Sequence, residues 1–372
     1  RVDFVDALRT FTARVVGTPE QRAALTDDHE LTHSDGLYRR LGELGYLSVG
    51  FPEEHGGGGG TILDTCLLVE ELFYAKTPVA GLSTTMTVGH AVERHADDEL
   101  RDDVLRSIAR GDTHALGFSE PEAGSDLANL RCRAVRADGG WVVSGQKTWT
   151  TNAHFADYVL LMVRTGEQDS RHEGITMLSV PMDSPGIEVR GIDTLGGREV
   201  NDVFLTDVFV PDERLVGAEG QGWRQLMAGL NGERLLIGAV YLGHARRAFD
   251  DGLAYVKERR QFGRPIGSFQ ALRHRFADLA TELACCRLMV YDLARRTEAE
   301  PEKTLPREAS MVKLKVTETA KHVALECMQS MGGYGFASEY GMEQHVRATL
   351  PATIFGGANE VQRDIIGKTY GL

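Results

Sequence analysis

Two short segments of this chain combine side chains that could bind a flat, polar cofactor. Residues 117–126, GFSEPEAGSD, contain a hydroxyl, a Pro turn and a Gly-Ser pair whose backbone can approach a ligand closely, because Gly has no Cβ. Residues 145–153, GQKTWTTNA, place Trp149 two positions before Thr151, and in an extended chain two such side chains point to one face. An aromatic surface beside a hydrogen-bond donor suits a planar heterocycle.

Other chemistries have less support in the sequence. The five cysteines lack CxxC spacing, which favours reduced thiols in the core, and the twelve histidines form no ligand-spaced pair, so we predict no metal site. The glycine run at residues 56–60 could cradle a phosphate, but no Lys-Ser/Thr follows it and no strand precedes it. We interpret it as a loop, and we expect the difficult chemistry to come from an organic cofactor.

The composition excludes some classes of partner. The 372 residues include 41 basic and 54 acidic side chains, a formal net charge of −13. Nucleic acid or an anionic membrane would need a basic face, so we predict neither as a partner. Because no run of about 18 apolar residues occurs, we expect a cytoplasmic protein.

The elements that must position these segments change in type along the chain. Apolar residues at helical spacing, such as Ile62, Cys66, Val69 and Phe73, predict helices before and after the glycine run. From about residue 113 to 221, β-branched and aromatic runs predict a small antiparallel β domain; they lie at residues 141–143, 158–163, 175–180 and 203–210. Helical spacing then returns, and without strand–helix alternation no Rossmann unit is expected.

The chain also resembles the acyl-CoA dehydrogenase family along almost its whole length. Besides the two segments above, motifs typical of the family follow in the family's order: residues 52–57 (PEEHGG), 207–211 (DVFVP), 259–266 (RRQFGRPI), 329–333 (QSMGG) and 360–363 (EVQR). The resemblance implies an α+β fold with an N-terminal α-helical domain (1–113), a middle antiparallel β-barrel or sandwich domain (114–221) and a C-terminal four-helix bundle (222–372). It also implies a homotetramer, a dimer of dimers, with FAD in a cleft shared between subunits.

The resemblance further implies which residues bind FAD. Phe118, Ser119, Gly124 and Ser125 would line the flavin or the neighbouring pantetheine, Trp149 would pack against the ring system, and Thr151 would donate a hydrogen bond to flavin N5. Of the remaining residues, Arg259, Gln270 and the 329–333 turn would reach the pyrophosphate and adenosine of FAD in the partner subunit. The full C-terminal set is Arg259, Phe262, Gln270, Gln329, Gly332, Gly333, Ala358 and Glu360.

The catalytic base occupies an unusual position. Many family members carry a glutamate in a segment like IYEGT, but here the matching segment is IFGGA, with Gly356 at the place of the base. Isovaleryl-CoA and long-chain acyl-CoA dehydrogenases instead carry the glutamate just before an arginine, and Glu233 and Arg234 match that pair. We therefore predict Glu233 as the base, with a pKa raised by burial.

Four residues are predicted to bind the substrate: Ser125, Asn231, Arg234 and Gly356. The backbone N–H of Gly356 would polarise the thioester carbonyl, a role that survives loss of the side chain. We also expect the missing glutamate side chain to free volume beside the α and β carbons, which would favour branched, cyclic or bulky acyl groups.

The predicted activity is FAD-dependent α,β-dehydrogenation of an acyl-CoA, in fatty or branched acyl metabolism, with electrons passed to an electron-transferring flavoprotein. One alternative is a dehydrogenase of acyl or prolyl groups held on a carrier protein. A second is a non-catalytic partner subunit of a heteromeric acyl-CoA dehydrogenase, suggested by Gly356. A third is a flavin oxidase that uses oxygen directly.

Overall fold

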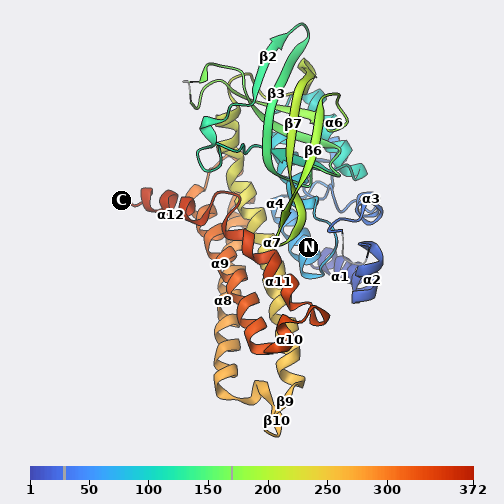
Figure 1. Cartoon of the computed structure of the whole chain (residues 1–372), viewed down its shortest axis with the longest axis vertical. Coiled ribbons are helices and arrows are strands. Elements are labelled where there is room, and N and C mark those ends of the chain that lie inside the picture. The colour runs from blue at the N-terminus through green and yellow to red at the C-terminus, as the bar shows by residue number, and fades with distance from the viewer. Residues whose placement is uncertain (28–30, 169–170) are drawn as a thin grey trace. The chain divides into compact units, whose positions relative to one another are not determined.

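The computed structural model describes residues 1–27, 31–168 and 171–372 (Figure 1). Helices come first, strands follow, and helices return, as the sequence predicts. The chain divides into two compact units. Unit 1 contains residues 1–24, 62–77 and 233–372, and unit 2 contains residues 25–61 and 78–232. The division into three domains at residues 113/114 and 221/222 stays a prediction.

Unit 2 is built on one eight-stranded sheet, in which β6-β7-β3-β2-β4-β5-β8 are neighbours and β1 pairs with β4. The strands are β1 (His114–Gly117), β2 (Arg133–Ala137), β3 (Gly140–Thr151), β4 (Tyr158–Arg164), β5 (Ile175–Pro181), β6 (Ile187–Thr194), β7 (Gly197–Pro211) and β8 (Leu215–Val216). Most pairings are antiparallel, as expected, but β4 runs parallel to β1 and, through one residue pair, to β2. The sheet buries an apolar core that includes Trp141, Val143 and Leu161.

Helices α3 (Asp35–Glu43), α5 (Leu82–His95) and α6 (Asp98–Arg110) also belong to unit 2. The glycine run between them is a loop, as predicted, but a closely packed one. It follows the short helix η1 (Glu53–His55) and turns back on the preceding segment, with Gly58 N–H donating to Ser48 O at 2.8 Å. A Cβ on Gly57 would lie 2.0 Å from Phe51 O, so this position requires glycine.

Unit 1 contains three long helices that run alongside one another (Figure 1): α7 (Gly222–Glu258, which begins in unit 2), α8 (Gln270–Ala299) and α9 (Pro306–Met331). The strands β9 (Arg260–Gln261) and β10 (Arg264–Pro265) form a hairpin before α8. After α9 the chain continues through α10 (Gly333–Phe336), α11 (Met342–Thr349) and α12 (Asn359–Lys368), and both α11 and α12 pack on α9. Within the described residues, no helix is long and apolar enough to cross a membrane.

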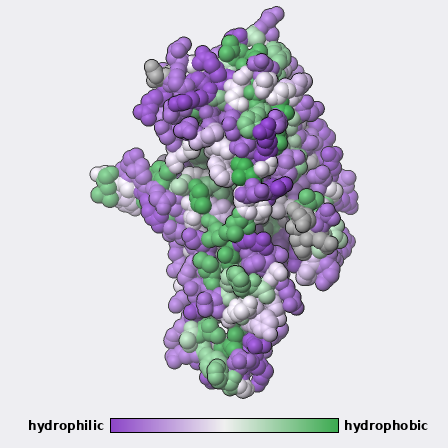
Figure 2. Space-filling model, in the orientation of Figure 1, coloured by the Kyte–Doolittle hydropathy of each residue, from purple (hydrophilic) through white to green (hydrophobic). Residues whose placement is uncertain are grey.

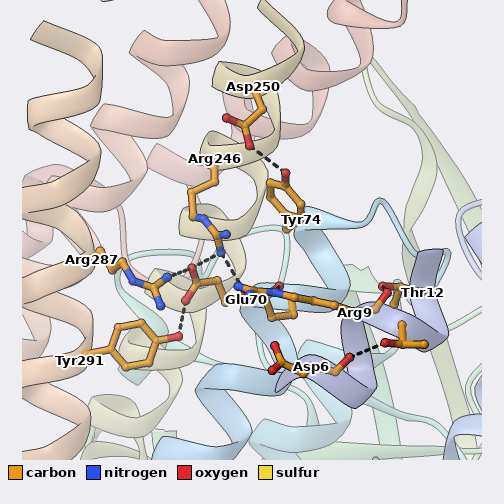
Figure 3. A network of polar contacts seen from close by, with 11 residues as sticks. Asp6, Arg9, Thr12, Glu70, Tyr74, Arg246, Asp250, Arg287 and Tyr291 are labelled. Atoms are coloured by element: carbon orange, nitrogen blue, oxygen red, sulfur yellow. Dashed lines mark hydrogen bonds and ion pairs between the residues drawn. The ribbon is translucent and has the colours of Figure 1, made fainter. Parts of the chain in front are cut away.

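A buried carboxylate joins the N-terminal helices to this bundle. Helices α1 (Val2–Val16), most of α2 (Pro19–Leu25) and α4 (Ile62–Tyr74) belong to unit 1. Glu70 on α4 is fully buried and accepts hydrogen bonds from Arg246 on α7 and from Arg287 and Tyr291 on α8 (Figure 3). The adjacent Glu71 accepts from Arg9 at 2.8 Å. Charged groups from four helices therefore meet in one network.

Candidate active site

The two segments that the sequence singled out lie side by side in unit 2. Thr148 N–H donates to Ser119 O at 2.9 Å, and the Lys147 ammonium donates to Phe118 O at 3.2 Å. The same ammonium forms an ion pair with the Glu120 carboxylate at 2.7 Å, and both side chains are buried. The backbone carrying Phe118 and Ser119 is thereby fixed against the strand that carries Trp149.

Glu120 and Lys147 are positioning residues that the sequence analysis missed. The Glu120 carboxylate also accepts from the backbone N–H groups of Arg131 and Cys132, at 2.6 and 2.9 Å. A tight turn, closed by reciprocal hydrogen bonds between Glu120 and Ala123, leads to Gly124 and Ser125, which are exposed. The sequence alone does not show whether a charged residue is buried. The only signal for this pair was that Glu120 lies in the segment 117–126 and Lys147 in the segment 145–153.

Trp149 stands at a β-bulge. The pairing of β3 with β7 shifts register between Lys147 and Thr150, and Trp149 has a φ of 56°, in the left-handed region. Its side chain is 59% exposed, while Thr150 is buried and Thr151 half-buried. A bulge re-aims side chains and is common beside active sites. The left-handed backbone at Trp149 departs from the extended chain that the sequence argument assumed, so a shared face for the indole and the Thr151 hydroxyl stays a prediction.

Glu233 and Gly356 meet in unit 1, although 122 residues separate them in sequence. An ideal Cβ built on Gly356 would lie 3.9 Å from Glu233 Oε1. A carboxylate on α7 thus lies next to the position from which a side chain at residue 356 would start. The two base positions known from the resemblance, one at residue 233 and one at residue 356, converge on one place in this fold.

The Glu233 carboxyl is half-buried and makes no hydrogen bond to any residue that the structure describes. Burial raises its pKa, while the positive charges of Arg234 and Lys313 act in the opposite direction. Arg234 is itself buried, and its Nε has no partner in the described part of the chain. Asn231, the other predicted substrate residue, is half-buried one turn before Arg234 on α7.

The expected free volume at residue 356 is not present. A Cβ on Gly356 would lie 2.4 Å from Ile237 Cδ1, because the Ile237 side chain occupies that space. Ile237 follows Glu233 by four residues, so both side chains project from the same face of α7. One turn of α7 therefore supplies the carboxyl group of Glu233 and fills the space beside Gly356 with Ile237. The expectation that free volume at residue 356 favours bulky or branched acyl groups no longer has a basis.

The C-terminal residues predicted to bind cofactor lie in two places on unit 1. At the first, the Arg259 guanidinium lies 5.1 Å from the ring centroid of Tyr334, which immediately follows Gly332 and Gly333. Cβ atoms on these two glycines would meet no atom within 4 Å, so their backbone is open to a ligand. Gln329 and Gln270 are exposed, and Phe262, at the tip of the β9–β10 hairpin, is 91% exposed.

The second place is a cavity of about 280 Å³ at the start of α12. Ala358 and Glu360 line it together with the cationic side chains of Lys321 and Arg363. Lys321 is near the middle of α9, whereas Gln329 is near its end. The structure therefore groups the predicted residues into an open glycine turn and a separate cavity.

Comparison with known families covers the chain from end to end. It matches the acyl-CoA dehydrogenase N-terminal domain over residues 2–112, the middle domain over residues 115–208 and the C-terminal domain over residues 220–371. The chain belongs to the acyl-CoA dehydrogenase family. Members of this family are oxidoreductases that act on CH–CH groups and depend on FAD, so the resemblance seen in the sequence is confirmed.

Among relatives of this acyl-CoA dehydrogenase, a probable acyl-CoA dehydrogenase, YngJ, of Bacillus subtilis is 34% identical and covers 89% of this chain and 88% of its own length. Benzylmalonyl-CoA dehydrogenase of Aromatoleum aromaticum is 33% identical over 94% and 92%, and isovaleryl-CoA dehydrogenase of Arabidopsis thaliana is 32% identical over 89% and 82%.

Solved structures agree with the fold. An acyl-CoA dehydrogenase from Geobacillus kaustophilus superposes with a TM-score of 0.92 at 30% identity, covering 99% of this chain and 97% of the other. The FAD complex of PigA superposes with a TM-score of 0.91 at 26% identity, covering 100% and 97%. N-terminal helices, a middle β domain and a C-terminal helical domain are thus confirmed.

The residues of this acyl-CoA dehydrogenase fit FAD. Unit 2 offers an exposed indole, nearby hydroxyl groups and the open backbone at Gly124, which suit a flat ring with polar edges. Unit 1 offers an open glycine turn next to a guanidinium, which suits phosphates. The cavity at the start of α12 is lined by two cations, Lys321 and Arg363, and by the carboxylates of Glu318 and Glu360. These donor sets match the two chemically different halves of a flavin dinucleotide.

Proposed function

We propose that this enzyme oxidises an acyl thioester to its α,β-enoyl form, with Glu233 as the base that takes the α-proton. One observation carries this proposal: the Glu233 carboxyl has no hydrogen-bond partner among the described residues and lies 3.9 Å from the Cβ position of Gly356. A carboxylate with a raised pKa and no donors is suited to accept a proton near neutral pH.

The other residues of the chain bind and orient the reactants. The Gly356 N–H, which has no acceptor in the described part of the chain, donates to the thioester carbonyl and stabilises negative charge on its oxygen. Trp149 and Thr151 hold the flavin ring, and Phe118, Ser119, Gly124 and Ser125 line the ring or the neighbouring pantetheine. When bound, FAD supplies the acceptor for the β-hydride. Asn231 and Arg234 complete the substrate side.

The cofactor halves and the assembly follow from the same proposal. Arg259, Gln270 and the turn that contains Gln329, Gly332 and Gly333 reach the pyrophosphate and adenosine of FAD bound in the partner subunit. The cofactor-binding set also includes Phe262, Ala358 and Glu360. A homotetramer with FAD shared between subunits is supported by hydrophobic surface over the C-terminal helices (Figure 2). Large exposed side chains in this part of the chain are Tyr334 and Phe336 on α10 and Phe262 on the β9–β10 hairpin. We further propose a cytoplasmic enzyme that passes its electrons to an electron-transferring flavoprotein.

Anaerobic bleaching of the flavin absorbance near ~450 nm tests the reaction. A panel of straight, branched and aromatic acyl-CoAs is compared with the same acyl groups on a carrier protein, and bleaching by the carrier-bound group alone would identify a carrier-protein dehydrogenase. Peroxide release would indicate an oxidase. Protein that stays colourless after FAD addition would indicate a non-catalytic subunit.

The variant Glu233→Gln tests the base. We expect it to bind FAD and to lower the rate of bleaching by about 10²–10⁴-fold, the usual contribution of a positioned base. Glu282→Gln is the matched control, because Glu282 is a partly exposed glutamate on α8 that pairs with Lys315 and belongs to no candidate site. Undiminished bleaching in Glu233→Gln would remove Glu233 from this role.

A further inference from the structure

A layer of buried polar side chains lies beneath the turn formed by Gly356 and Gly357. Lys313 and Thr317 come from α9, and Asn359 and Gln362 come from α12; all four are at most 2% exposed. Lys313 Nζ donates to Gly357 O at 3.0 Å and to Asn359 Oδ1 at 2.9 Å. Gln362 Nε2 donates to the same Gly357 O at 2.9 Å.

These contacts hold the 356–357 turn from below. Both glycines have positive φ values, 60° and 76°, which place them in the left-handed region. Gln362 also donates to Gly356 O, at 3.3 Å, so both carbonyl groups of the turn are bound to buried donors. The N–H groups of the two glycines have no acceptor within the described ranges, which leaves them free to bind a ligand.

Lys313 is an unexpected donor for this purpose. Burying an ammonium group costs several kcal/mol unless an anion compensates it, yet among the described residues Lys313 donates only to a backbone carbonyl and an amide oxygen and forms no ion pair. Its two partners are neutral oxygens, for which a neutral donor such as Gln362 suffices. Burial lowers the pKa of Lys313 to about 8. A hydrogen-bonding role alone does not account for a lysine here.

The charges around Lys313 suggest what its ammonium does. The side chains that act on it through space are Glu233 and Arg234 from α7, Glu360 from α12 and Glu318 from its own helix. Glu233 is the first of these in strength after burial, and the interaction is mutual, since Lys313 opposes the rise in the pKa of Glu233. The lysine therefore connects the turn with the carboxyl group.

We propose that Lys313 is a positioning residue of the active site: it fixes the 356–357 turn whose N–H faces the substrate carbonyl, and its positive charge favours the ionised form of Glu233. This inference rests on the proposed function of Glu233. A single buried side chain would then set both the geometry of carbonyl binding and the protonation state of the base.

Two variants separate the charge from the hydrogen bond. Lys313→Met and Gln362→Met each remove one donor to Gly357 O, but only the first removes a positive charge. If Lys313→Met fails to fold, Lys313→Met with Asn359→Leu replaces the lysine and its side-chain acceptor by apolar groups of similar size. Each protein is studied loaded with FAD and without substrate.

The deciding measurement is the infrared pH titration of the Glu233 carboxyl band, identified as the band that Glu233→Gln lacks. In Lys313→Met, or in the double variant, we expect the midpoint to rise by about one pH unit, a tenfold smaller ionised fraction below it. In Gln362→Met the midpoint should stay at its wild-type value. The pH at which bleaching by an active acyl-CoA begins should move with the midpoint.

An unchanged midpoint in the lysine variants, or an equal rise in Gln362→Met, would overturn the proposal. This failure differs from failure of the proposed function. If Glu233→Gln still bleaches normally, Glu233 is not the base, whatever the titration shows. If Glu233→Gln is inactive and the midpoint does not move, only the role of Lys313 falls.

Discussion

Two glutamates of unit 1, Glu70 on α4 and Glu233 on α7, differ in how many hydrogen-bond donors surround them. Glu70 is fully buried and accepts hydrogen bonds from two guanidinium groups and a phenol. Glu233 is half-buried and accepts none from the described residues, while burial raises its pKa. A carboxylate that accepts from three donors on two other helices stabilises one arrangement of those helices. A carboxyl group without donors remains able to exchange a proton.

The largest expected effect is that substitution of Glu70 lowers stability and leaves activity, whereas substitution of Glu233 lowers activity. Glu70→Gln should destabilise the fold by about 3 kcal/mol, because Arg287 loses its buried anion and Arg246 keeps only its ion pair with Glu71. Urea unfolding of the FAD-loaded protein measures this loss. Bleaching per bound flavin should be retained, in contrast to Glu233→Gln. A Glu70 variant that is stable but inactive would break the comparison.

Glu120 in unit 2 extends the comparison to a second carboxylate with several donors. Glu120→Gln should lower the free energy of unfolding by about 2–3 kcal/mol, since Lys147 loses its counter-charge while the amide oxygen still accepts one N–H. FAD affinity should fall too, because Phe118 and Ser119 lose part of their support. Isothermal titration with FAD, beside urea unfolding, tests both effects. If Glu120→Gln kept full stability, the hydrogen bonds donated to Glu120 would not indicate a structural role for this carboxylate.

Gly356 tests how closely the surroundings of Glu233 are packed. Gly356→Ala should destabilise the protein by about 2 kcal/mol, through a left-handed φ and a contact with Ile237 Cδ1. Gly356→Ala combined with Ile237→Val removes that methyl group and should recover part of the loss. Thermal unfolding of both variants decides the matter. An alanine variant as stable as the wild type would argue against the tight contact.

The smallest expected effect concerns pH and stability. The pKa of Glu233 is raised in the folded chain, so the folded state holds this proton to a higher pH than the unfolded state does. Below the ordinary pKa of 4.5 the residue has no net effect, and as pH rises through the folded-state pKa its ionisation destabilises the fold by about 1.4 kcal/mol per unit of difference. Relative to Glu233→Gln, the wild type should therefore lose stability with rising pH; parallel stability curves from pH 4 to 8 would contradict this.

Long periodic elements were predictable from the sequence. The spacing of Ile62, Cys66 and Val69 identifies α4, and the apolar runs identify β3, β4, β5 and β7. Strand β6 was missed because most of its residues are exposed, so it lacks an apolar run. Strand β2 was missed for a similar reason, since its five residues are two arginines, two alanines and a single valine, Val135, and form no apolar run.

In the candidate site, motifs located the residues but not what holds them. The segments at 117–126 and 145–153 were found as separate features, whereas the Glu120–Lys147 ion pair that joins them depends on burial. The contact of Ile237 with the space beside Gly356 could not be predicted for a different reason. Its effect on Gly356 arises from contact between segments 119 residues apart, which no local pattern encodes.

Helix α9 fixes the spacing between two parts of the site. Lys313 lies beneath the 356–357 turn near one end, and Gln329 adjoins the open glycine turn at the other, about 24 Å away at 1.5 Å per residue. Deleting one residue between them would rotate one end against the other by about 100°. The length of this helix therefore sets both the distance between the two parts and their rotation about the helix axis. We therefore expect an insertion or deletion within α9 to preserve both parts of the candidate site only when its length is close to a whole number of turns.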